Sequence, residues 1–556
     1  MQWVWDKAKN QAEKFSFFSF CIIMANAVLF GTGNFTHELN FSIFSVCILL
    51  TICFFAFSIV KCAKEILRNL YFWLLIGLGI SVLVSCFVGM KNNNKAEFIS
   101  ADVKCLIYFV LFPITVTLLS KKDRILTLMK VIVYASFAQG IMGLFFIICF
   151  LFFPDLFEKL LYIAYYGEIL NFTRISATIP RILFVSTPFQ LCGCAMSLYF
   201  IATEKKNLWQ YPLIIGTSLF FMLMTFTRAL YLAAFIVAVL SILMFFVLSK
   251  KECRKRFMTC VISAVLICLL LVGIFSISTK TNYIEFALQR IGVTIVGSDP
   301  DDEIVKNTDS DGGYSSANAK TDSVQESVSS EVVGNVPNSG KNTLTDTGSN
   351  IISDASTDNF STSDTTDPVQ ESVSSEVASN VTNSDKNTSS NTDSQTIFDT
   401  SIGDSSASET IHDENLNYLD ETVISDNRRG EITRELLLQI KKAPILGGGL
   451  GFRLEGRDYS YPEYFFLDLW AKMGIVGLVL FLLPVFVGVC SVIKKIVKRE
   501  DFILQGVWLV SILGLLVYAI FQPYMNNAPC ILFYCCVLSV LSLKDIPKIK
   551  QMDSRN

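Results

Sequence analysis

Long apolar runs, separated by short polar segments, form the dominant pattern along this chain. A helix needs about 20 apolar residues to cross a bilayer. Twelve runs approach or exceed that length, at residues 15–32, 42–60, 70–90, 103–120, 131–153, 183–203, 209–226, 229–249, 258–277, 467–493, 502–521 and 528–543. The pattern therefore predicts an all-α polytopic membrane protein with about twelve transmembrane helices.

One long polar segment interrupts the series of apolar runs. It divides the chain into transmembrane helices one to nine (1–277), a loop (278–466), helices ten to twelve (467–543) and a C-terminal tail (544–556). The composition agrees, with 52% hydrophobic and 17% charged residues, because a soluble protein of this size could not cover so much apolar surface. The first apolar run carries no evident cleavage signal and is expected to remain as a helix.

Lysine and arginine are distributed unequally between the two sides of the predicted helices. If the N-terminus is cytoplasmic, the seven segments on that side carry 25 basic residues, against seven in the short outer loops. Basic residues concentrate on the cytoplasmic side of membrane proteins. We therefore expect both termini in the cytoplasm and the long loop outside.

The middle of the long loop, residues 299–427, has a composition unlike the rest of the chain. It holds 26 Asp and Glu against four Lys, whereas the remainder holds 42 basic residues against 23 acidic ones. The stretch "VQESVSSEV" at 324–332 recurs at 369–377, but neither copy has an apolar face to bury. This predicts a disordered, solvated insert without a catalytic role, or alternatively a spacer or cation-attracting fringe in the cell envelope.

The sequence offers little for metal or nucleotide binding. Only two histidines are present, and the sixteen cysteines lie outside the insert without CxxC spacing, which is typical of small buried hydrophobes. The P-loop pattern is absent, and "GGGLGF" does not fit a dinucleotide-binding fingerprint. We expect no metal, no cofactor and no nucleic-acid partner.

Arginines stand out among the few ionisable residues beside the outer ends of the predicted helices. Arg228 lies between two apolar runs with almost no loop to carry it into water. A charge at membrane depth is costly and usually has a partner or ligand, although an arginine can also extend to the lipid headgroups. Arg174 and Arg181 lie in the outer loop before the sixth run.

Residues 429–442 have the periodicity of an amphipathic helix. Ile432, Leu436 and Ile440 recur four residues apart, and Pro444 follows the last turn, so we expect a helix lying on the outer membrane surface. Arg429 would lie in its first turn, which is unfavourable for a cation. It is therefore either placed to meet an anion or simply solvated.

The segment after this helix, "APILGGGLGFR" at 443–453, combines four glycines with a proline. Glycine permits positive φ angles and close approach of the backbone, and successive N–H groups can form a nest for an anion. The residues of interest are Gly447, Gly449 and Gly451. The alternative interpretation is a tight turn that redirects the chain into the membrane, and the two roles are compatible.

These features together resemble the O-antigen ligase and O-antigen polymerase superfamily of bacterial envelope proteins. The resemblance rests on "RGEITRELLLQIKKAPILGGGLGF" at 429–452, "LDLWAKMGIVGLVLFLL" at 467–483 and "TFTRALYLAAFIVAVL" at 225–240, with "RISATIP" at 174–180 as a looser match. It covers roughly residues 170–280 and 428–490, together with the twelve-span plan.

The resemblance implies a location in the bacterial cytoplasmic membrane and glycosyl transfer on its outer face. The donor would be a lipid-linked oligosaccharide on polyprenyl diphosphate, and the acceptor a sugar hydroxyl. Polymerisation of capsule, exopolysaccharide or O-antigen repeat units is expected, and the alternatives are a ligase acting on a lipid or protein acceptor and a flippase or transporter of the lipid-linked glycan. Membrane lipid, a flippase and a chain-length regulator are further candidate partners.

The resemblance also assigns roles to residues. Arg228 and Arg429 would bind the diphosphate with help from Arg174 or Arg181, because guanidinium groups can bind phosphate bidentately. Counted back from Gly474, the position of the family's histidine, a general base, holds Glu463.

A buried glutamate can act as a base because burial raises its pKa. Asp458 and Asp468 are rivals for the role, and a plain ion pair of Glu463 with Arg453 or Arg457 is the alternative.

Overall fold

The computed structural model describes most of the predicted membrane part of the chain. The described residues are 2–31, 46, 48–49, 51–52, 59–166, 169–176, 179–204, 208–248, 251–288, 413–454, 464–498 and 500–543. The chain divides into two compact units, Met1–Asp302 with Glu409–Asn556, and Glu303–Ser408. The second unit, which holds most of the predicted acidic insert, lies outside the described residues.

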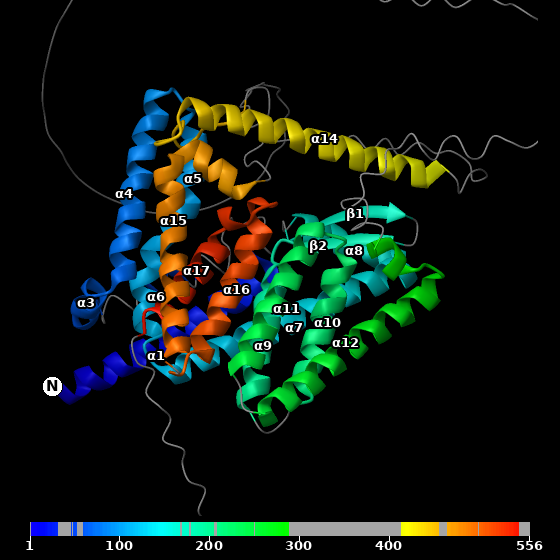
Figure 1. The fold of residues 1–556 in the computed structure, drawn as a ribbon, viewed down its shortest axis with the longest axis horizontal. Coiled ribbons are helices and arrows are strands. Elements are labelled where there is room, and N and C mark those ends of the chain that lie inside the picture. The colour runs from blue at the N-terminus through cyan, green and yellow to red at the C-terminus, as the bar shows by residue number, and fades with distance from the viewer. Residues whose placement is uncertain are drawn as a thin grey trace, which may run out of the picture. The chain divides into compact units, whose positions relative to one another are not determined.

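Within the described residues, seven helices are long and apolar enough to span a membrane, so the chain is a multi-pass membrane protein. They correspond to α1 (Gln2–Phe30), α4 (Leu70–Lys91), α5 to α6 (Ala96–Leu106, η1 Ile107–Leu111, Phe112–Leu118), α7 (Lys122–Phe152), α11 (Arg228–Leu248), α12 (Lys251–Thr279) and α15 (Phe465–Val497) (Figure 1). Each coincides with a predicted run. The run at 42–60 lies mostly outside the described residues, apart from residues 46, 48–49 and 51–52 and the start of α3 (Ile59–Leu67).

Four further predicted spans form apolar helices of 14 to 17 residues, shorter than a typical span. They are α9 (Phe189–Thr203), α10 (Gln210–Met224), α16 (Ile503–Ala519) and α17 (Ala528–Leu541). Every residue of α17 is buried, and the side chains of α9 and α16 are buried on nearly all sides. These helices therefore pack against other helices, and the longer ones carry most of the exposed apolar side chains.

Buried polar side chains join α7 to α9 inside this helical bundle. Gln190 Nε2 donates to the carbonyl of Ser136 and to Gln139 Oε1, both at 2.8 Å, and Gln139 Nε2 donates to Ser186 Oγ at 2.6 Å. Hydrogen bonds between helices stabilise membrane bundles because the alternative is an unsatisfied polar group in hydrocarbon. The pair therefore fixes the register of α7 against α9.

A β-hairpin, which the sequence pattern did not predict, lies in the loop before the sixth predicted span. Strands β1 (Leu170–Ser176) and β2 (Ile179–Phe184) pair antiparallel after the short helix α8 (Pro154–Tyr166). Ile182 and Phe184 are buried in an aromatic cluster with α7, α8 and α10. The described residues are otherwise helical, so the all-α prediction holds apart from this two-stranded sheet.

Helix α14 (Asp413–Lys442) differs from its predicted counterpart in two respects (Figure 1). It begins at Asp413, sixteen residues before the predicted start at 429 and inside the segment 299–427 predicted as disordered, and it ends at Lys442 as predicted. Its predicted apolar face, Ile432, Leu436 and Ile440, is buried, but against Ala471 of α15 and its neighbours. The apolar face is thus covered by protein, and the prediction of a helix whose face lies in the membrane surface is wrong for these residues.

Helix α15 is broken at Gly474, where φ is 67° and ψ is −176°. The break releases backbone groups that an intact helix would pair internally. The segment after α14 satisfies them, since Gly448 and Gly449 donate to the carbonyls of Ala471 (2.7 Å) and Lys472 (3.0 Å). In return, Ile475 donates to the carbonyl of Pro444 at 2.9 Å.

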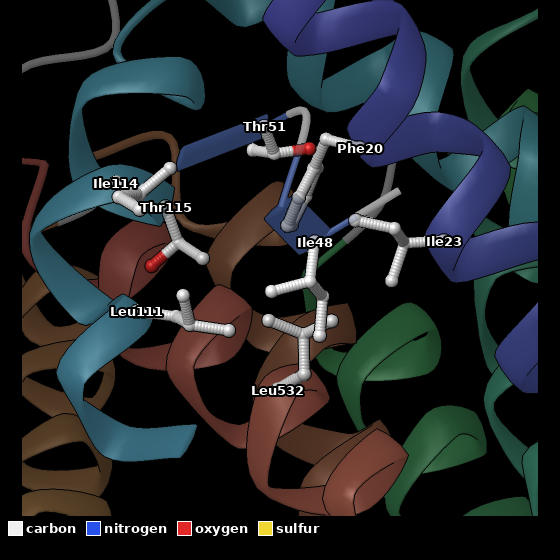
Figure 2. Close-up of a pocket in the computed structure, with 8 residues that line it drawn as sticks. All are labelled: Phe20, Ile23, Ile48, Thr51, Leu111, Ile114, Thr115 and Leu532. Atoms are coloured by element: carbon white, nitrogen blue, oxygen red, sulfur yellow. The ribbon is translucent and has the colours of Figure 1, made fainter. Parts of the chain in front are cut away.

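One cavity inside the bundle is very small. A void of about 10 Å³ lies between α1, α6 and α17, lined by Phe20, Ile23, Ile48, Thr51, Leu111, Ile114, Thr115 and Leu532 (Figure 2). That volume holds roughly one water-sized probe. It is a packing defect, too small for a sugar or a diphosphate.

Gly474→Ala should destabilise the protein strongly. A Cβ there would overlap the carbonyl oxygen of Ile445, and the positive φ angle is itself unfavourable for alanine. We expect a loss of at least about 2 kcal/mol, measured as a lower unfolding temperature of the detergent-solubilised protein. Gly79→Ala in α4 is the control, because a Cβ there meets nothing within 4 Å. Equal unfolding temperatures for both variants would contradict the close packing described at Gly474.

Candidate active site

Two of the predicted arginines meet at the turn between α10 and α11. Arg181, on β2, donates from Nε to the carbonyl oxygen of Thr225 at 3.2 Å. Arg228 is the first residue of α11, three positions further along, and is half-buried. The turn therefore gathers two cations that are separate in sequence, at the end of α10 that was predicted to face outward.

The turn itself is held by internal hydrogen bonds around an unusual residue. Phe226 has a φ of 49°, which is rare for a bulky side chain, and it is fully buried against Phe286 with ring centroids 5.0 Å apart. Thr227 donates from Oγ1 to the carbonyl of Thr225 at 3.1 Å. Burial of the phenyl ring offsets the backbone strain, which is typical of turns that aim a functional side chain.

Arg228 begins a helix, where the exposed N–H groups already carry partial positive charge. The guanidinium of Arg228 is therefore repelled by the helix N-terminus unless an anion lies nearby. An anion bound between them would be stabilised both by the guanidinium and by the N–H groups of the helix. Arg181, fixed to the same turn, adds a second guanidinium. The arrangement is suited to an anion with several oxygens, such as a diphosphate.

The remaining predicted arginines lie on two other elements, β1 and α14. Arg174 is in β1, and its Cα lies opposite that of Pro180 in β2; its side chain is outside the described residues. Arg429 is half-buried on α14, which contacts both α15 and β1. Glu463, the predicted base, lies outside the described residues, as does Asp458.

The three glycines predicted to bind substrate have their N–H groups occupied by the protein. Gly447 donates to the carbonyl of Ala443, Gly449 to that of Lys472, and Gly451 to Asp102 Oδ2 at 2.8 Å. All three have positive φ angles, as expected. Substrate binding by these residues stays a prediction, whereas the alternative role, a bend that carries the chain back to the membrane, agrees with the hydrogen bonds.

Four buried charged side chains surround this bend, and we refer to them as the ion network: Asp102 of α5, Arg453, and Asp468 and Lys472 of α15. Arg453 binds both oxygens of Asp102, at 3.1 and 3.2 Å, and Lys472 Nζ lies 3.1 Å from Asp102 Oδ1 and 2.7 Å from Asp468 Oδ2. Each side chain is at most 8% exposed. Two positive and two negative charges balance, which is the arrangement that makes buried charge tolerable.

The ion network bears on two sequence-based alternatives. The Arg453 guanidinium pairs with Asp102 and lies 4.8 Å from the Phe98 ring; its expected alternative partner, Glu463, lies outside the described residues, so that pairing stays a prediction. Asp468 was considered as a rival base, but it is buried and bound to Lys472. Both residues therefore contribute to the framework around the bend.

Sequence reasoning missed Asp102 and Lys472, although a signal was present. Lys472 lies inside the predicted span 467–493, and a charge within a span calls for a partner. Asp468 stands four residues before it, the spacing at which helical side chains meet. The partner from α5 had no such signal, because Asp102 lies 366 residues before Asp468 in the sequence.

Comparison with known proteins gives no relative from which a function can be transferred: no family model, no curated protein and no solved structure matches this chain.

Asp102→Asn should destabilise the fold, because it leaves Arg453 and Lys472 buried with one carboxylate between them. Breaking a buried ion pair costs about 3–5 kcal/mol, to be measured by thermal unfolding in detergent. Glu97→Gln is the control on the same helix, since Glu97 is 68% exposed and lies 4.0 Å from Lys95. A double-mutant cycle with Arg453→Gln should reveal coupling; strictly additive effects would contradict the network.

Proposed function

We propose that this protein is a glycosyltransferase of the outer face of the bacterial cytoplasmic membrane, which polymerises repeat units carried on polyprenyl diphosphate. The observation that supports it most is the bond from Arg181 to Thr225, three residues before Arg228. A diphosphate leaving group needs stabilisation of its developing charge, and guanidinium groups supply it without a metal.

The proposed reaction is a single displacement at the anomeric carbon. The acceptor hydroxyl forms the new carbon–oxygen bond, and the bond to the phosphate oxygen breaks with its electron pair leaving on the diphosphate. The proton of the hydroxyl passes to a base, for which Glu463 is the proposal. Direct displacement inverts the anomeric configuration, so an NMR assignment of product linkages with retained configuration would exclude this route.

Arg228→Ala and Arg181→Ala should each lower polymerisation by about 10²-fold or more, the effect typical of removing one transition-state donor. The assay uses purified protein in detergent with lipid-linked repeat units, scored by chain length on gels. For Arg429→Ala, which we also expect to lower activity, Arg434→Ala is the matched control, because it is an exposed arginine on the same helix.

Glu463→Gln should abolish the activity while leaving the donor bound, since it removes the base and keeps the side-chain size. Single lipid-linked repeats would accumulate in cells that carry this variant in place of the native protein. Full-length chains in all of these variants would refute the site. Long chains that remain unattached to their final acceptor would instead indicate a ligase.

A transporter of the lipid-linked glycan is a second candidate, favoured by the broken helix α15 and the ion network beside it. Discontinuous helices and buried charges are both common in transporters. The two functions are separable, because a polymerase lengthens chains in detergent, where there is no second compartment. Protein that moves the lipid-linked glycan across liposome membranes but never extends it would be a transporter.

A further inference from the structure

A pocket of about 460 Å³ opens between the beginnings of α10 and α12, at the opposite end of α10 from Thr225. Its lining combines two cations, a hydroxyl and an apolar floor: Lys255, Arg256, Thr259, Leu208 and Cys260. None of these five residues is acidic. The pocket is remote along α10 from the arginines of the candidate active site and has no role in the proposed reaction.

The pocket exists because of the way in which α10 and α12 cross. At Gly216 the two helices approach so closely that a Cβ would lie 2.8 Å from the carbonyl oxygen of Ala264. The helices run parallel, since Phe220 meets Phe275 further along both of them. About two turns before the crossing point they have separated, and Leu208 faces residues 255–260 across the gap.

The position of the pocket along α12 corresponds to the edge of a bilayer. The apolar part of α12, Arg254–Thr279, begins at the pocket. Trp209, directly before α10, is 73% exposed there, and tryptophan is enriched at the level of the lipid headgroups. A ligand in the pocket would therefore have its polar end in the headgroup region and its apolar end among the acyl chains.

We propose that this pocket binds the headgroup of an anionic phospholipid from the adjacent leaflet. Lys255 and Arg256 are complementary to the phosphate, and basic pockets between transmembrane helices are suited to such headgroups. Thr259 Oγ1 donates to the carbonyl of Lys255 at 3.0 Å, so its oxygen is oriented to accept from a headgroup hydroxyl such as that of glycerol. Leu208 and Cys260 contact the start of the acyl chains, which free phosphate lacks.

The test measures lipid binding by the full-length protein in detergent, by native mass spectrometry with added phosphatidylglycerol or phosphatidylcholine. The native protein should prefer phosphatidylglycerol. Lys255→Gln with Arg256→Gln should weaken that binding about 30-fold, equivalent to about 2 kcal/mol. Lys494→Gln with Lys495→Gln is the matched control, since it removes two charges from the end of α15 and should change binding less than threefold.

A second variant separates a built pocket from general electrostatic attraction. Thr259→Phe places a phenyl ring in the pocket where the headgroup would lie and keeps both cations, so it should also weaken phosphatidylglycerol binding by tenfold or more. The proposal is overturned if this variant binds as the native protein does, or if the two double variants lose affinity equally. Displacement of phosphatidylglycerol by excess inorganic phosphate would overturn it as well, because it would indicate a plain anion site.

Discussion

The break in α15 at Gly474 is the constraint on which the packing of α4, α5, α14 and α15 depends. At membrane depth each unsatisfied backbone group costs several kcal/mol, and irregular backbone is tolerated only where protein covers it. The segment Pro444–Gly449 fulfils that condition by donating to, and accepting from, the groups that the break releases. The close fit explains the glycines, since a Cβ on Gly449 would lie 2.1 Å from the backbone nitrogen of Gly89 in α4. The glycine-rich segment, whose composition suggests a phosphate-binding loop, therefore pairs with the backbone groups that the break in α15 leaves unsatisfied.

The ion network also fixes the place where the glycine-rich bend packs against α15. Asp102 accepts from Arg453, from Lys472 and from the N–H group of Gly451, so that α5, the bend and α15 converge on one carboxylate. Buried ion pairs contribute little net stability compared with apolar packing, because desolvation offsets their attraction. Their effect is specificity: a misplaced bend would leave an uncompensated charge, so only one arrangement of the three segments is favourable. Since α14 leads directly into the bend, its position follows from the same junction.

The sequence predicted the parts of this structure that local periodicity determines. Apolar runs located eleven of the twelve expected spans on described helices, and the spacing of Ile432, Leu436 and Ile440 identified the buried face of α14. What covers that face was not predictable, because Ala471 comes from another element and an apolar face has the same pattern against lipid as against protein. The hairpin was missed for the same reason: Ile182 and Phe184 are buried by tertiary contacts with α7 and α10. Arg181 and Arg228 were identified individually, whereas their proximity depends on the hairpin.

The proposed reaction uses arginines and a carboxylate, so the rigidity of the elements that carry the arginines matters for it. In the proposed reaction, stabilisation of the diphosphate would depend on how well the guanidinium groups are held before the reaction begins. Arg181 is fixed to the carbonyl of Thr225, and Arg228 follows a turn whose strained residue, Phe226, is buried. Arg429 belongs to a helix seated on α15 through Leu436. Long, flexible side chains are thus mounted on elements with little freedom, so the entropy lost on binding an anion is reduced. The strain at Phe226 and the buried charges near Gly474 therefore have a common explanation in the rigidity that such a site requires.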